Sequence, residues 1–503
     1  MYYERAQHPG CARLGLLRRR AERPGLPPPY PASVTQTAPA PAPPAVGRST
    51  DREHLFTRMW AVAALAHVVG NGWQGDVLPT PDAGGIALAA VSVAAFAALL
   101  RPGRLPLLVL STTIVVSAVV EVPILGNHWL VAALVSLAYL LSGGRWGGFE
   151  PAARLVLLVF YSFAAFAKIN EGFADPAVSC AVFYADQSLT AAGLAPLTPG
   201  GTATAVLPWL VTAIELSVPV LLIVRPTRWV GVLLALGFHS TASFDLGQHF
   251  YDFTAVLAAL FVLFLPDAWS RAATDRLRRL PAVLTAGVAG AAVALTALLV
   301  LASLVPLGAL PWRTDRLAFV VWVPYAVTLI VLVLLGPRRS ERLSWRPAAL
   351  AWLAVALTLL NGLTPWTETK TAFGFTMYSN LEVAQGQTNH TLVPATLPLR
   401  DGLDRLVAVE SSSDPGLAAY AGSGYLLPWP SFAVYVRDHP GMDVTYRDGV
   451  RLDGSAGTPA AITPGEDTAE ALGPLPWWWQ WMPLRAVDTQ SPPRCQVAWL
   501  PAL

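Results

Sequence analysis

The chain has 503 residues, of which 54% are hydrophobic and only 13% are charged. Soluble domains carry about a quarter charged residues, so this composition excludes an ordinary soluble protein and indicates an integral membrane protein. The net charge of +2 does not by itself indicate a partner, and the three cysteines exclude a dense disulfide framework and a cysteine-rich zinc site.

The first segment, residues 1–52, is rich in Pro, Ala and Arg, with three consecutive arginines at 18–20 and an Ala-Pro run at 38–44. No apolar segment follows closely enough for a signal peptide. We interpret these residues as a disordered, basic, cytoplasmic tail.

The next segment, residues 53–364, reads as a polytopic transmembrane helical bundle. A membrane-spanning helix needs roughly 17–25 residues, most of them apolar. Eleven apolar runs approach or meet this length, near residues 56–74, 83–100, 105–125, 128–143, 153–170, 204–224, 228–246, 250–266, 283–305, 316–336 and 346–364.

The arginines predict how these spans are oriented. One set of alternate short connections holds nearly all of them, at positions 101, 104, 145, 154, 225, 228, 271, 276, 278, 279, 338, 339, 342 and 346. The opposite connections hold only Arg313 and Arg316. Because cytoplasmic loops are enriched in basic residues, we expect a multi-pass protein of the cell membrane with a cytoplasmic N-terminus and an external C-terminus.

Residues 365–503 are more polar and are expected to form a small extracytoplasmic, β-rich domain. Runs at 432–436 and 444–446 read as strands, and the pair Asp448-Gly449 followed by residues 450–452 predicts a hairpin. Trp477, Trp478, Trp479 and Trp481 are suited to the headgroup layer. Cys180 and Cys495 are both predicted outside, where they could pair.

Few polar residues interrupt the apolar runs. Lys168 ends the fifth run, Glu215 lies midway along the sixth and His239 lies in the seventh. The others are Glu121, Asn127, His128, Asn170, Asp245, His249 and Asp252. The predicted topology puts Lys168, Asn127-His128 and residues 245–252 in the outer half of the membrane.

Lys168 has two interpretations. It could extend its ammonium to the interface, as lysines at helix ends do. It could instead remain buried, where a desolvated lysine gives up its proton readily and becomes a neutral base. Glu215 could be its counter-ion or a neutral hydrogen-bonded acid, and His239 could simply pack in the bundle. The histidine spacing matches no compact metal motif, so we expect no metal.

Four motifs occur in an order that resembles a known family. They are NHW at 127–129, the stretch YSFAAFAKIN at 161–170, ELSVP at 215–219, and Phe238-His239 followed by FDLG at 244–247. Together they resemble the vitamin K-dependent γ-glutamyl carboxylase family, whose bacterial relatives share the horizontally transferred transmembrane (HTTM) domain. The resemblance covers roughly residues 53–336.

The resemblance implies roles for particular residues. In the carboxylases, the lysine matching Lys168 deprotonates vitamin K hydroquinone, and oxygen converts the quinol into an alkoxide that removes a γ-proton from glutamate before CO2 adds. The histidine matching His128 supports the quinone site. Asn127, Glu215 and His239 would then help to hold the cofactor, a reduced naphthoquinone of the vitamin K or menaquinone type. Two departures are the sequence STAS at 240–243, where the family often has an asparagine, and the short region after residue 364.

Two main hypotheses about function follow. The first is a quinol-coupled carboxylase or epoxidase with Lys168 and His128 as catalytic residues. The alternative is a non-catalytic HTTM protein that binds lipid, quinone or a secreted peptide in maturation, export or immunity. A proton-coupled transporter is less favoured because no duplicated half is visible. The expected partners are the lipid bilayer and a secreted peptide or protein, not a nucleic acid.

Overall fold

The computed structural model describes residues 50–72, 83–243, 250–279, 314–465, 472–474 and 479–495, with five isolated positions between 287 and 297. Several sequence predictions therefore fall outside the described residues. They concern the tail up to residue 49, the motif at 244–247 with Asp245, His249, most of the predicted span 283–305, and Trp477 and Trp478.

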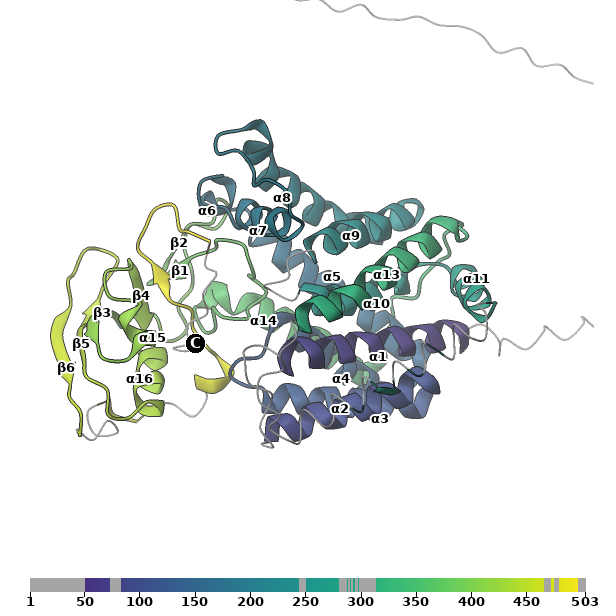
Figure 1. Cartoon of the computed structure of the whole chain (residues 1–503), viewed down its shortest axis with the longest axis horizontal. Coiled ribbons are helices and arrows are strands. Elements are labelled where there is room, and N and C mark those ends of the chain that lie inside the picture. The colour runs from purple at the N-terminus through teal and green to yellow at the C-terminus, as the bar shows by residue number, and fades with distance from the viewer. Residues whose placement is uncertain are drawn as a thin grey trace, which may run out of the picture. The chain divides into compact units, whose positions relative to one another are not determined.

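The described part of residues 50–363 is almost entirely helical (Figure 1). Its first five helices are α1 (Thr50–Gly72), α2 (Ala83–Leu100), α3 (Arg104–Val120), α4 (Asn127–Leu141) and α5 (Trp146–Phe166). Consecutive helices of this set pack against one another, and α1 also packs against α10. The remaining helices are α6 (Glu171–Ala174), α7 (Cys180–Ala191), α8 (Thr202–Ile223), α9 (Arg228–Ala242), α10 (Phe250–Phe261), α11 (Asp267–Arg278), α13 (Thr314–Leu335) and α14 (Trp352–Leu363).

The apolar runs predicted the helix positions well. Every predicted span except 283–305, which lies mostly outside the described residues, overlaps one of these helices. Three described helices, α2, α5 and α8, are long and apolar enough to cross a membrane. Shorter apolar helices occupy 104–120, 127–141, 250–264, 321–335 and 349–363. A mainly helical fold compatible with a membrane protein is thus confirmed, whereas the number of eleven spans stays a prediction.

The helix exteriors carry apolar side chains. On α8 the exposed side chains include Val206, Trp209, Leu210, Val220 and Ile223. The exposure of several large apolar side chains along one helix suits contact with lipid.

Arg154 departs from its predicted place in a loop. It lies inside α5, which begins at Trp146, and is 1% exposed. Its guanidinium pairs with Glu150 and donates to the carbonyl oxygens of Leu263 (2.9 Å) and Ser344 (3.2 Å). Because its charge and donors are matched, the arginine is tolerated within the helix. The predicted apolar run began only at residue 153, whereas the helix begins at Trp146.

The C-terminal region contains a five-stranded antiparallel sheet in the order β6-β5-β3-β4-β7. The strands are β3 (Leu406–Ser412), β4 (Tyr425–Pro428), β5 (Val444–Val450), β6 (Thr458–Ile462) and β7 (Val487–Asp488). A separate two-stranded ladder is formed by β1 (Val383–Ala384) and β2 (Gln387–Thr388). The short helices α15 (Pro415–Ala418) and α16 (Trp429–Asp438) complete the region, and α16 packs its apolar face on the sheet.

Two local predictions in this region are wrong. Residues 432–436, predicted as a strand, lie in α16, where Pro430 occupies the first turn that favours proline. The Asp448-Gly449 pair is not a hairpin turn, because β5 continues through it. Gly449, with φ of 72°, lies at a register shift against β3 and so supplies a β-bulge instead. The hairpin turn falls later, between β5 and β6.

Candidate functional site

A cavity of about 1010 Å³ lies among α5, α7, α8, α9 and α10. Most of its lining is apolar, with side chains such as Leu207, Val211, Leu233 and Phe253. Its polar side chains include Lys168, Glu215, Tyr161 and His239. The structure therefore brings together three of the five site residues predicted from the sequence.

Lys168 lies just beyond α5, in the turn that follows Phe166. Its Nζ is 2.8 Å from Oε2 of Glu215 on α8, and it donates to the carbonyl oxygen of Ala164 at 3.2 Å. The two side chains are only 6% and 10% exposed. The alternative that Lys168 extends to the interface is therefore wrong, and Glu215 is its counter-ion, as one reading of the sequence expected.

Tyr161 and His239 form a second polar pair in the cavity wall. The Tyr161 hydroxyl and Nε2 of His239 are 3.0 Å apart and buried. The rings of Phe253 and Phe261 lie against the imidazole, with centroids 5.5 and 6.1 Å away. A hydroxyl and an imidazole in contact can pass a proton or orient a polar ligand atom.

Asn127 and His128 are not among the residues that line the cavity. The side-chain oxygen of Asn127 accepts a hydrogen bond from the backbone N–H of Phe375 at 3.2 Å. His128 contacts Asp252, its Nε2 lying 2.9 Å from Oδ2. The ring of Phe253, which lines the cavity, lies 6.4 Å from that of His128. The ring of Phe253 therefore lies between His128 and the cavity that Lys168 lines.

Sequence reasoning missed His67, near the end of α1. Its Nδ1 is 3.2 Å from Nε2 of His128, and its Nε2 is 3.2 Å from Oε1 of Glu121. The sequence around a single histidine in an apolar helix does not show that it belongs to a polar cluster, because its partners come from other helices.

Two further segments, 375–380 and 389–390, held none of the predicted site residues. Met377 and Tyr378 line the cavity. The Asn170 amide donates to the Ser379 carbonyl at 2.5 Å, and the Asn389 amide donates to the side-chain oxygen of Asn170 at 3.3 Å. Met377 and Tyr378 therefore form part of one wall of the cavity, and the hydrogen bonds of Asn170 hold their segment in place.

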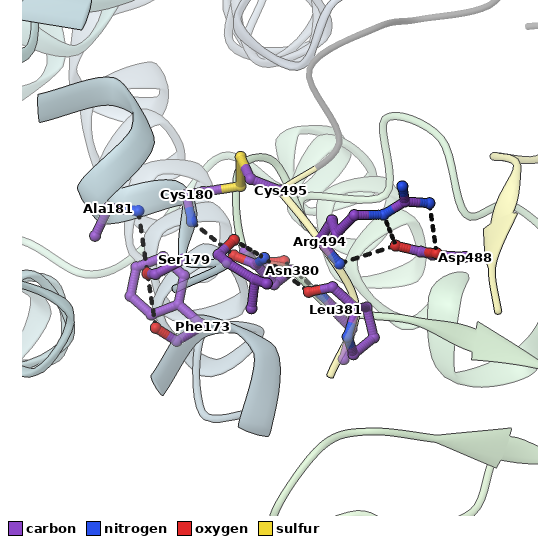
Figure 2. The surroundings of a disulfide bond; sticks show 12 residues. Phe173, Ser179, Cys180, Ala181, Asn380, Leu381, Asp488, Arg494 and Cys495 are labelled. Carbon is purple, nitrogen blue, oxygen red and sulfur yellow. Dashed lines mark hydrogen bonds and ion pairs between the residues drawn. A yellow bond between two sulfur atoms is a disulfide. The ribbon is translucent and has the colours of Figure 1, made fainter. Parts of the chain in front are cut away.

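A disulfide joins Cys180 at the start of α7 to Cys495 (Figure 2). Beside it, the side-chain oxygen of Asn380 accepts from the Cys180 N–H at 2.9 Å, and Arg494 forms an ion pair with Asp488. Cys180 also lines the cavity. The pairing suggested by the sequence is thus present in the structure.

Among the titratable groups outside the helical bundle, Glu382 and Lys370 have shifted pKa values. Burial raises the pKa of Glu382 to about 8, and burial lowers the pKa of Lys370 to about 8. The Lys370 ammonium donates to the Asn361 side chain at 2.9 Å. Neither residue lines the large cavity.

Comparison of the chain with protein-family models, with curated proteins and with solved structures produced no match.

Proposed function

We propose that this protein is a multi-pass membrane protein of the HTTM type that binds a reduced naphthoquinone in the large cavity and uses Lys168 as the base. The proposal includes a cytoplasmic N-terminus and an external C-terminal region. The observation that carries it is the buried Lys168–Glu215 pair in the wall of an apolar cavity of about 1010 Å³.

The cavity suits an amphipathic ligand that arrives through lipid. Its apolar lining from α7, α8 and α9 would cover an isoprenoid chain. Its polar groups, Lys168, Glu215, Tyr161 and His239, would meet a ring with hydroxyl groups. The donor and acceptor types present therefore fit a quinol.

Lys168 can accept a quinol proton while the cavity wall and the ligand together stay neutral. An ammonium has three N–H donors, and the carbonyl oxygen of Ala164 takes one of them, while the Glu215 carboxylate lies 2.8 Å away as the ion-pair partner. Transfer of a proton from Lys168 to Glu215 would give a neutral amine beside a neutral acid. The amine could then accept the hydroxyl proton of a bound quinol, which, once deprotonated, supplies the reactivity toward oxygen.

The test compares variants of the only two lysines in the chain. The full-length protein in proteoliposomes receives reduced menaquinone and oxygen, and epoxide formation is followed by mass spectrometry. We expect Lys168→Ala to lower the rate by at least 100-fold, the scale of general base catalysis. Lys370→Ala, which removes a buried lysine outside the cavity, should retain most of the rate. Equal rates for the wild type and Lys168→Ala would refute the role of Lys168.

A second candidate is a non-catalytic quinone- or lipid-binding protein. The observation that favours it is the short Lys168–Glu215 ion pair itself, since a paired lysine serves structure without any chemistry. In this case quinone would be retained through purification, but no epoxide or carboxylated peptide would form. A secreted peptide recovered with the protein at unchanged mass would favour the same reading.

A further inference from the structure

We propose that His67, His128 and Asp252 bind a divalent transition-metal ion, and that Glu121 orients His67 for this purpose. The three side chains come from α1, α4 and α10. This proposal does not rest on the quinol site, because none of the three residues lines the large cavity.

The three potential ligand atoms converge. Nδ1 of His67 is 3.2 Å from Nε2 of His128 and 3.9 Å from Oδ2 of Asp252, and the last two atoms are 2.9 Å apart. A triangle with these sides has a common point roughly 2 Å from each corner, which is the length of a Zn²⁺ bond to histidine nitrogen or carboxylate oxygen.

The surroundings of His67 prepare its Nδ1 as a ligand. Nε2 faces Glu121 at 3.2 Å, so a proton on Nε2 leaves the lone pair of Nδ1 directed at His128 and Asp252. Glu121 in turn accepts from Ser117 at 2.7 Å. Trp129 stacks on the imidazole with centroids 3.6 Å apart. A carboxylate behind a histidine is the usual support of a metal ligand.

Hydrogen bonds among these three atoms compete with one another. With the His67 proton committed to Glu121, a single N–H of His128 would have to serve both His67 and Asp252. If His67 carried both protons, the lone pair of His128 Nε2 would face the carboxylate oxygen at 2.9 Å. A cation at the common point removes this conflict, because all three atoms then act as electron-pair donors.

A divalent ion is also compatible with the charge of this cluster. Within the described part of the chain, the ion-pair partners of Asp252 and Glu121 are histidines only. Neutral imidazoles would leave two negative charges in a buried cluster, at a high desolvation cost. One divalent ion balances both. Two nitrogens and one oxygen suit Zn²⁺ or Fe²⁺ better than Mg²⁺ or Ca²⁺.

The test uses full-length protein in nanodiscs, stripped with a chelator and titrated with Co²⁺, whose visible absorption reports coordination by nitrogen and oxygen. We expect one equivalent to bind, and Zn²⁺ to displace it. His67→Ala and Asp252→Asn should each abolish this uptake, whereas His439→Ala, which removes an exposed histidine of the C-terminal region, should leave it unchanged.

Glu121→Gln tests the site without removing a ligand. It should retain binding with an affinity 10–100-fold weaker, as for other outer-shell changes. This variant remains informative if His67→Ala does not fold. Wild-type protein that takes up less than a tenth of an equivalent overturns the proposal, as does undiminished uptake by Asp252→Asn. Loss of the metal with wild-type epoxide formation would leave the quinol proposal intact.

Discussion

Lys168 and Glu215 depend on each other. Both side chains are almost fully buried, and the only charged group that either contacts in the described structure is the other. Removing two charges from water costs several kcal/mol per ion, and their mutual attraction returns this only while both are present. The pair is therefore tolerated as a unit.

Removing one partner should be more harmful than removing both. We expect Glu215→Gln to lower the free energy of unfolding by about 3–5 kcal/mol, because it leaves an ammonium without its counter-ion. The double variant Lys168→Met/Glu215→Leu should recover most of this loss. Denaturant titration in mild detergent measures both. A double variant less stable than Glu215→Gln alone would contradict the coupling.

Lys168 could be predicted from the sequence, and His67 could not, for a physical reason. A lysine in an apolar run is costly wherever the helix packs, so composition alone singles it out. His67 becomes a site candidate through partners such as His128, 61 residues further along the chain, and no local spacing encodes that contact. The expectation of no metal rested on the spacing of histidines along the sequence, which does not report contacts between distant helices.

The connection between α14 and the sheet is conformationally unusual. Six of its non-glycine residues have positive φ: Glu368, Phe373, Phe375, Tyr378, Asn380 and Gln385. This conformation is a rare one for bulky side chains and costs of order 1–3 kcal/mol each. It persists because tertiary contacts fix it, such as the burial of Phe375 in the helical core.

Asn380 makes it possible to separate backbone strain from hydrogen bonding in this segment. Its amide accepts from Cys180 and donates to Val178 and Pro493, at 2.9, 2.9 and 3.1 Å. Asn380→Ala loses these bonds and also places an alanine at φ of 54°, so we expect a loss of about 2–4 kcal/mol. Asn380→Gly, which adopts this φ freely, should be more stable than Asn380→Ala by about 1 kcal/mol. Thermal unfolding of both variants in detergent checks this order, and equal stabilities would exclude strain.

Elements formed by long apolar runs could be predicted, whereas short strands could not. A run of apolar residues has no stable arrangement in lipid other than a helix, so α2, α5 and α8 follow directly from composition. A local sequence such as Asp448-Gly449 can form either a hairpin turn or a β-bulge. Pairing with β3 decides between them, and this pairing is not local.

The stability of the whole protein should depend on pH through Glu382. Its pKa is raised from 4.5 to about 8 by burial, so between these values the folded state holds a proton that the unfolded state has released. Stability should therefore fall as pH rises from about 5 to 8, by up to about 1.4 kcal/mol per pH unit. Lys370 has the opposite effect on stability, but only above pH 8. There the folded state has already lost the Lys370 proton, whereas the unfolded state still holds it.

Glu382→Gln should flatten this dependence, because an amide does not titrate. Unfolding temperatures in detergent at several pH values between 5 and 8 measure the slope for each variant. Glu410→Gln, which removes an exposed carboxylate on β3, should keep the wild-type slope. An unchanged slope in Glu382→Gln would assign the pH dependence to other groups.

The Cys180–Cys495 bond restricts how the chain can be threaded through a bilayer. Two sulfur atoms can join only on the same side of a membrane, so the chain between them must cross it an even number of times. The sequence predicts six crossings there, which obeys this parity, and any revised topology must add or remove spans between the two cysteines in pairs. Because such bonds persist in oxidising compartments, the bond is compatible with the expectation that Cys180 and Cys495 lie outside the cell.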